Sequence, residues 1–144
     1  MPTATPTAEA TTATSAPAAT VPEVLAAFPR ADILVSGETW TVVIADTPAL
    51  RSQGLMGVSD LGDLDGMLFV FEADTTVGFW MKDTLIPLDV ALFGAEGTLV
   101  DLLAMVPCAD DPCPTYHPSG RYRYALESAP GAFEGLEPLE LVVP

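Results

Sequence analysis

The spacing of the apolar segments limits the possible folds more than any other feature. From residue 39 onward, short apolar runs are separated by turn signals about every 8–12 residues. Gly94 and Gly97 bound a loop that suits a β-hairpin. The sequence therefore predicts a mainly β, compact, antiparallel, barrel-like domain with a few short helices. The expected strands cover residues 39–44, 67–71, 77–81, 88–93, 98–105, 122–127 and 139–143.

One helix is predicted over residues 48–53. Thr47 suits the N-cap position, Pro48 suits the first helical position, and Gly54 suits the residue that ends a helix. The segment Gly131–Gly135 predicts a second, shorter turn.

The first 20 residues differ in composition from the rest of the chain. They are rich in Thr, Ala and Pro and hold no Val, Ile, Leu or aromatic residue, which predicts a disordered linker. We expect a short helix or linker over residues 21–32 and a single globular domain over 33–144. Such a tether is typical of an exported domain, either secreted or anchored through a segment outside these 144 residues. The alternative is a disordered tail on a cytosolic protein.

The charge balance limits the possible partners. The formal charge is −15, which disfavours binding to the phosphate backbone of nucleic acid. No apolar run approaches the roughly 20 residues of a transmembrane helix. The sequence holds none of the usual phosphate-loop, dinucleotide, zinc-protease or nucleophile-elbow motifs, so it indicates no cofactor and leaves any protein partner unknown.

Five segments together resemble a known family. They are TPALRSQGLM (47–56), GMLFVF (66–71), FWMKDTLIPLD (79–89), PCADDPCPTY (107–116) and YALESAPG (124–131). In this order and spacing, the chain resembles the family named domain of unknown function 192 over about residues 40–143. The resemblance implies a compact, mostly antiparallel β domain that is frequently exported in bacteria, and it lends no catalytic residue. The family commonly has Asn where this chain has Asp83.

Several charged residues inside apolar segments are candidates for a binding groove. Strand alternation places Trp80 and Lys82, the only lysine, on one face. A recessed ammonium group beside an indole suits a carboxylate or a sugar. The alternative is a structural Lys–Asp pair whose stem packs along Trp80. The aromatic residues of the apolar segments are expected to belong to the core rather than to form a binding platform: Trp40, Phe69, Phe71, Phe79, Trp80 and Phe93. The candidate binding residues are Arg51, Trp80, Lys82, Asp83, Asp89 and Glu127.

The two cysteines lie close together in the sequence. In an exported chain, Cys108 and Cys113 predict a local disulfide. A metal site that adds His117, the only histidine, and a pair of free thiols are the alternatives.

These features favour an extracytoplasmic binding or accessory domain without enzymatic activity, with a glycan or a small carboxylate as ligand. One alternative is a small hydrolase that uses Asp89 and Glu127 as paired carboxylates, since each lies in an otherwise apolar strand. A metal-handling protein is the other alternative.

Overall fold

The structure, a computed structural model, describes residues 22–108, 110 and 112–144. The linker predicted over residues 1–20 lies outside the described residues. In chain order, the elements are η1 (Glu23–Leu25), β1 (Arg30–Val35), β2 (Glu38–Ala45), α1 (Pro48–Gln53), β3 (Gly66–Thr75), β4 (Phe79–Trp80), β5 (Leu88–Phe93), β6 (Leu99–Met105), β7 (Thr115–Tyr116), β8 (Tyr122–Ser128) and β9 (Leu141–Val142).

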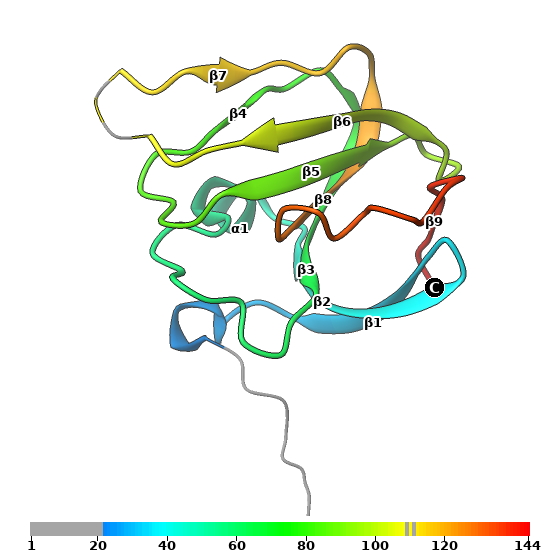
Figure 1. Cartoon of the computed structure of the whole chain (residues 1–144), viewed down its shortest axis with the longest axis horizontal. Helices are drawn as coiled ribbons and strands as arrows, with labels where there is room; N and C mark the ends of the chain where they lie inside the picture. Colours follow the sequence, from blue (N-terminus) through cyan, green and yellow to red (C-terminus); the bar gives the residue numbers. More distant parts are fainter. Residues whose placement is uncertain (1–21, 109, 111) are drawn as a thin grey trace, which may run out of the picture.

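Seven of the strands form one curled sheet in the order β6-β5-β8-β3-β2-β1-β9 (Figure 1). Neighbouring strands are antiparallel except β2 and β3, which are parallel and are connected through α1. The two edges approach each other where Thr98 bridges Glu140 and the Leu141 amide donates to the Gly97 carbonyl at 3.0 Å. The predicted fold class, mainly β and barrel-like, is confirmed.

Helix α1 has the bounds and the caps that the sequence predicts. The Thr47 hydroxyl accepts a hydrogen bond from the Leu50 amide at 3.2 Å, and Pro48 occupies the first turn. Gly54 ends the helix with a φ of 49°, a conformation that favours glycine, while its amide donates to the Leu50 carbonyl. The helix therefore ends at Gly54, beside the Phe69 ring of β3.

The predicted strand over residues 77–81 is shorter in the structure. Only Phe79 and Trp80 pair, because their partner β7 offers just Tyr116 and Thr115. Strands β1 and β7 were not expected from the sequence. Charged residues at the start of β1 and prolines around β7 hide the alternation that identifies the other strands.

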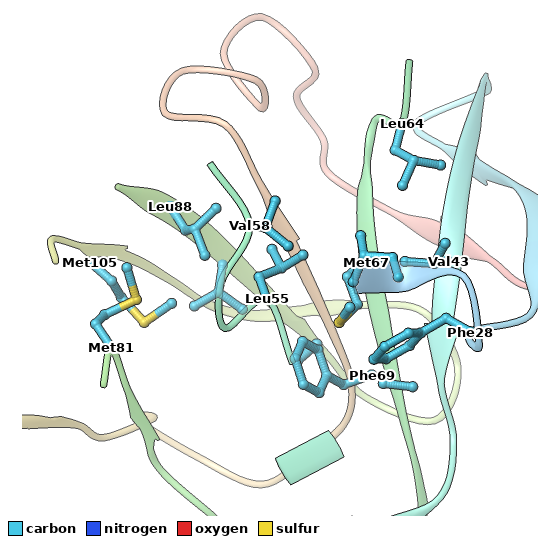
Figure 2. Close-up of a cluster of buried hydrophobic side chains, with 14 of the residues drawn as sticks. Phe28, Val43, Leu55, Val58, Leu64, Met67, Phe69, Met81, Leu88 and Met105 are labelled. Atoms are coloured by element: carbon cyan, nitrogen blue, oxygen red, sulfur yellow. The ribbon is translucent and has the colours of Figure 1, made fainter. Parts of the chain in front are cut away.

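Each face of the sheet carries a cluster of buried side chains. The larger cluster includes Phe28, Val43, Met67, Phe69, Met81, Leu88 and Met105, which Figure 2 labels. The smaller cluster, on the opposite face, is built around Trp40 and Phe133, whose rings stack 5.3 Å apart. Leu25 and Phe28 are buried in the larger cluster, so the segment before β1 packs against the sheet. The domain boundaries stay a prediction.

The predicted disulfide is present between Cys108 and Cys113. We expect a variant with both cysteines replaced by Ser to lose roughly 2 kcal/mol of unfolding free energy, because the crosslink closes a loop of about six residues. Guanidinium denaturation measures this loss, and wild type under reducing conditions provides the matched control. An intact mass without the loss of two hydrogens, together with unchanged stability, would contradict the crosslink.

Candidate functional site

A pocket of about 360 Å³ opens between helix α1 and strands β3 and β4. Aromatic side chains form much of its wall, with Phe69 and Phe71 from β3 and Phe79 and Trp80 from β4. Residues 51–56 of α1 and the turn after it form the opposite wall. Two charged residues also line the pocket, Arg51 from α1 and Glu127 from β8.

Glu127 is the most unusual residue of the pocket. It lies opposite Met67 on β3 and Val90 on β5, so its side chain is on the face of the larger apolar cluster. Only 6% of the residue is exposed. No other described residue donates a hydrogen bond to its carboxyl group or forms an ion pair with it. Burial raises the pKa of Glu127 to about 8, so the group is mostly a neutral acid at pH 7.

The aromatic wall is held in place by ring contacts behind it. The Phe69 and Phe79 rings meet edge to face at 6.1 Å, and the buried Tyr122 ring contacts Phe71 at 5.5 Å and Phe79 at 5.8 Å. The Tyr122 hydroxyl donates to the Val77 carbonyl at 2.7 Å, which fixes the ring. Burial, and secondarily the charge of Glu127, raise the pKa of Tyr122. These contacts hold the three phenylalanine rings of the wall in place.

Trp80 is the exposed part of this wall. Half of its surface, 51%, is accessible to solvent, which corrects the expectation that it belongs to the core. It lies on the two-stranded β4–β7 sheet, which is separate from the seven-stranded sheet. The indole ring thus forms an apolar surface at the mouth of the pocket.

Arg51 is anchored on the α1 side of the pocket. Its Nη1 donates to the Val70 carbonyl at 2.8 Å, and its guanidinium carbon lies 4.9 Å from the centre of the Phe71 ring. The helix that the sequence predicts therefore directs a cation toward β3. This cation and the Glu127 carboxyl group line the same pocket without forming an ion pair.

The structure brings three of the six candidate residues, Arg51, Trp80 and Glu127, into one pocket. Lys82 lies outside the lining, with Nζ 6.0 Å from the centre of the Trp80 ring. Asp83 is exposed, and its carbonyl accepts from the Gly57 amide at 2.8 Å. It is therefore part of a turn rather than of the pocket.

The two carboxylates considered for hydrolysis are not brought together. Asp89 pairs with Ser128 in the β5–β8 register, whereas Glu127 pairs with Val90, so the two side chains are on opposite faces of the sheet. The Asp89 carboxylate accepts a hydrogen bond from the Gly131 amide at 3.0 Å. This contact fixes the turn after β8.

Metal and thiol chemistry find no support in the described part of the chain. Both sulfurs are consumed by the disulfide, so neither supplies a thiolate. His117 is exposed, and no three His, Cys, Asp or Glu side chains among the described residues gather as metal ligands do.

Four of the five segments that carry the family resemblance meet at this pocket. They are the segments over 47–56, 66–71, 79–89 and 124–131, and they supply most of the lining. The model of the DUF192 family, described as an uncharacterized ACR, matches residues 31–138. The chain belongs to the DUF192 family. Within the described residues, no helix has the length and apolar character needed to cross a membrane.

Two solved structures resemble this DUF192 chain. A protein of unknown function from Novosphingobium aromaticivorans DSM 12444 is 27% identical and has a TM-score of 0.72, over 90% of this chain and 94% of that one. A protein from Sinorhizobium meliloti 1021, described as a candidate transcription regulator, is 29% identical with a TM-score of 0.67, over 79% of this chain and 93% of that one. No curated protein matches the chain.

The departure from the common DUF192 motif has a conformational explanation. Asp83 has a φ of 56°, in the left-handed region that Asn and Asp tolerate better than other non-glycine residues. Asp83 therefore fills the turn position that Asn commonly fills in the family.

The sequence signal for the site was a charged residue in an apolar strand, and Glu127 fits it. Sequence reasoning missed the roles of Phe69, Phe71 and Phe79 in the wall, since a pocket wall and a core strand have the same apolar composition. The contribution of residues 52–56 was also missed, because it depends on how the helix packs on the sheet.

Proposed function

We propose that this DUF192 domain is an extracytoplasmic binding module that holds a small carbohydrate in the α1–β3–β4 pocket without catalysing a reaction on it. The observation that carries the proposal is Glu127, a buried carboxyl group without a partner among the described residues, in the lining of an open pocket. Buried polar groups are normally hydrogen-bonded. A ligand that reaches Glu127 would supply the hydrogen bond that the described residues do not provide.

The chemistry of the lining supports a carbohydrate over a small carboxylate. With its pKa raised to about 8, Glu127 both donates and accepts hydrogen bonds at pH 7, which matches the hydroxyl groups of a sugar. The half-exposed Trp80 ring provides a flat apolar surface for the C–H face of the sugar ring. The net charge of −15 repels small anions. Arg51, Trp80 and Glu127 are therefore the proposed contact residues.

Two features support the extracytoplasmic location. The Cys108–Cys113 disulfide is typical of an oxidising compartment. The Thr, Ala and Pro composition of residues 1–20 suits a tether between a membrane anchor and an exported domain. Cell fractionation of the native protein, with non-reducing mass analysis, tests the location directly.

The two tryptophans offer a direct test of sugar binding. Trp80 lies at the pocket, whereas Trp40 is buried in the smaller cluster on the opposite face of the sheet. We expect glucose, added at millimolar concentration, to shift the indole N–H resonance of Trp80 and to leave that of Trp40 in place. Failure of glucose and of other simple sugars to shift the Trp80 resonance would overturn the carbohydrate proposal.

Replacing Trp80 with Ala is expected to weaken sugar binding by roughly 2- to 10-fold, the usual range for one aromatic contact. Stability is expected to stay nearly constant, since the ring is half exposed. Leu85→Ala is the matched control, because Leu85 is 57% exposed and lies outside the pocket lining. Loss of binding in Lys82→Met, with Trp80→Ala unaffected, would instead favour a groove along Lys82.

A further inference from the structure

We propose that the pocket prefers ligands that carry a primary amine, with the ammonium group bound between the Glu127 carboxylate and the aromatic rings of β3 and β4. This inference rests on the proposed function for the location of the site. It goes further by naming the functional group that the site selects, and it holds for amines that are not sugars as well.

The inference starts from a buried acid that the fold leaves without a partner among the described residues. A buried carboxylate is costly unless an opposite charge or several hydrogen bonds accompany it, and no described side chain supplies either to Glu127. A sugar hydroxyl group forms an ordinary, uncharged hydrogen bond with the neutral Glu127 carboxyl group. An ammonium group offers three donors and the opposite charge, which makes the stronger, charge-assisted contact.

The walls of the pocket also suit a cation. Phe69, Phe79 and Trp80 line the pocket, and the face of an aromatic ring attracts an ammonium group within about 6 Å of the ring centre. The ammonium group of Lys82 already lies over the Trp80 ring, with Nζ 6.0 Å from its centre. The net charge of −15 raises the local concentration of cationic ligands.

Arg51 lines the same pocket and Tyr122 interacts electrostatically with Glu127, but neither residue compensates its carboxyl group. Arg51 binds the Val70 carbonyl and stacks on Phe71, at the α1 side of the pocket. The pKa of Glu127 is raised by burial, although the positive charge of Arg51 lines the same pocket. The Tyr122 hydroxyl donates its proton to the Val77 carbonyl and is therefore committed elsewhere. The acid is open to a cationic partner from the ligand.

The proton balance of binding follows from these charge states. In the free protein at pH 7, Glu127 holds a proton, because its pKa is about 8. When the ammonium group binds, that proton leaves for the solvent and the carboxylate pairs with the cation. Binding of an amine therefore releases about one proton per ligand, whereas binding of a neutral sugar releases almost none.

Calorimetric titration with four probes tests the inference. Glucosamine, glucose and N-acetylglucosamine share the ring and differ in the amine, and cyclohexylamine carries the amine without the hydroxyl groups. We expect glucosamine to bind roughly tenfold more tightly than glucose and N-acetylglucosamine. The titration is repeated in two buffers of different ionisation enthalpy, and the difference in observed binding enthalpy gives the number of protons released. Glu127→Gln, which keeps the shape of the side chain without its charge, is expected to remove both the preference and the proton release.

The outcomes separate this inference from the proposed function. Equal affinity for all three sugars, with the Trp80 resonance shifting, overturns the amine preference and keeps carbohydrate binding. Binding of cyclohexylamine alone, with proton release, keeps the amine preference and overturns carbohydrate binding. If no probe shifts the Trp80 resonance, both are overturned. Glucosamine binding that persists unchanged in Glu127→Gln also contradicts the inference.

Discussion

Replacing Glu127 with Gln is expected to abolish a large part of the pH dependence of stability between about pH 4.5 and pH 8. In wild type, the free energy of unfolding should fall across this range and level off above it. In the variant, the same range should be much flatter, and the variant should be more stable than wild type at pH 8. Denaturation in urea at several pH values measures both curves.

The sign follows from the two pKa values. Burial raises the pKa of Glu127 from 4.5 to about 8, so the folded protein keeps a proton that the unfolded chain has already lost. Folding is therefore penalised progressively as pH rises through this range. At about 1.4 kcal/mol per pH unit, the penalty reaches roughly 5 kcal/mol above pH 8. Gln has no ionised form and avoids the penalty.

The exposed Glu96, in the loop after β5, provides the control substitution. Glu96→Gln removes the same formal charge from the surface, and its stability curve should follow that of wild type. Parallel curves for wild type and Glu127→Gln would mean that Glu127 is ionised or compensated in the folded protein. That result would remove the main support for the pocket as a binding site.

Replacing Gly66 with Ala is expected to cost about 3 kcal/mol of unfolding free energy, because it overpacks the sheet at the position that places Glu127. Gly66 begins β3 beside β8, and an added Cβ would overlap the Glu127 carbonyl oxygen and lie 3.2 Å from its carbonyl carbon. Backbone atoms cannot rotate away as a flexible side chain does. The two strands must therefore separate at Glu127.

Urea denaturation measures the cost, and Gly94→Ala is the matched control. A Cβ at Gly94 would meet only the Thr98 carbonyl oxygen, at 4.0 Å, so that variant should be within a few tenths of a kcal/mol of wild type. We also expect Gly66→Ala to weaken binding of the pocket probes. Wild-type stability in Gly66→Ala would show that β3 and β8 do not approach closely at this position.

A helix or strand was predictable from the sequence where its residues are typical of only one position in such an element. Thr47, Pro48 and Gly54 define α1 to the residue, since an N-cap, a first-turn proline and a positive-φ residue each have few alternatives. The long apolar strands were predictable for a similar reason. Strand β4 was predicted too long, because its length depends on a two-residue partner far along the chain.

The candidate site was only partly predictable. A carboxylate in an apolar strand identifies Glu127 as unusual, because burying it without a partner is costly. Whether the Asp89 side chain lies beside Glu127 depends on the strand register, and the register places the two side chains on opposite faces of the sheet. The wall formed by Phe69 and Phe79 was not predictable, since the same residues fill a core or line a pocket depending on how α1 packs.

Titration of the Glu127 carboxyl carbon by NMR, in the protein without ligand, shows directly whether Glu127 is a buried acid without a charge partner. We expect a midpoint near pH 8, because the group is buried without a charge partner. We also expect saturating glucosamine to lower the midpoint, since the ammonium group stabilises the carboxylate. A midpoint near 4.5 in the free protein, unchanged by the amine, would show that Glu127 is an ordinary ionised carboxylate and is not the binding group of the pocket.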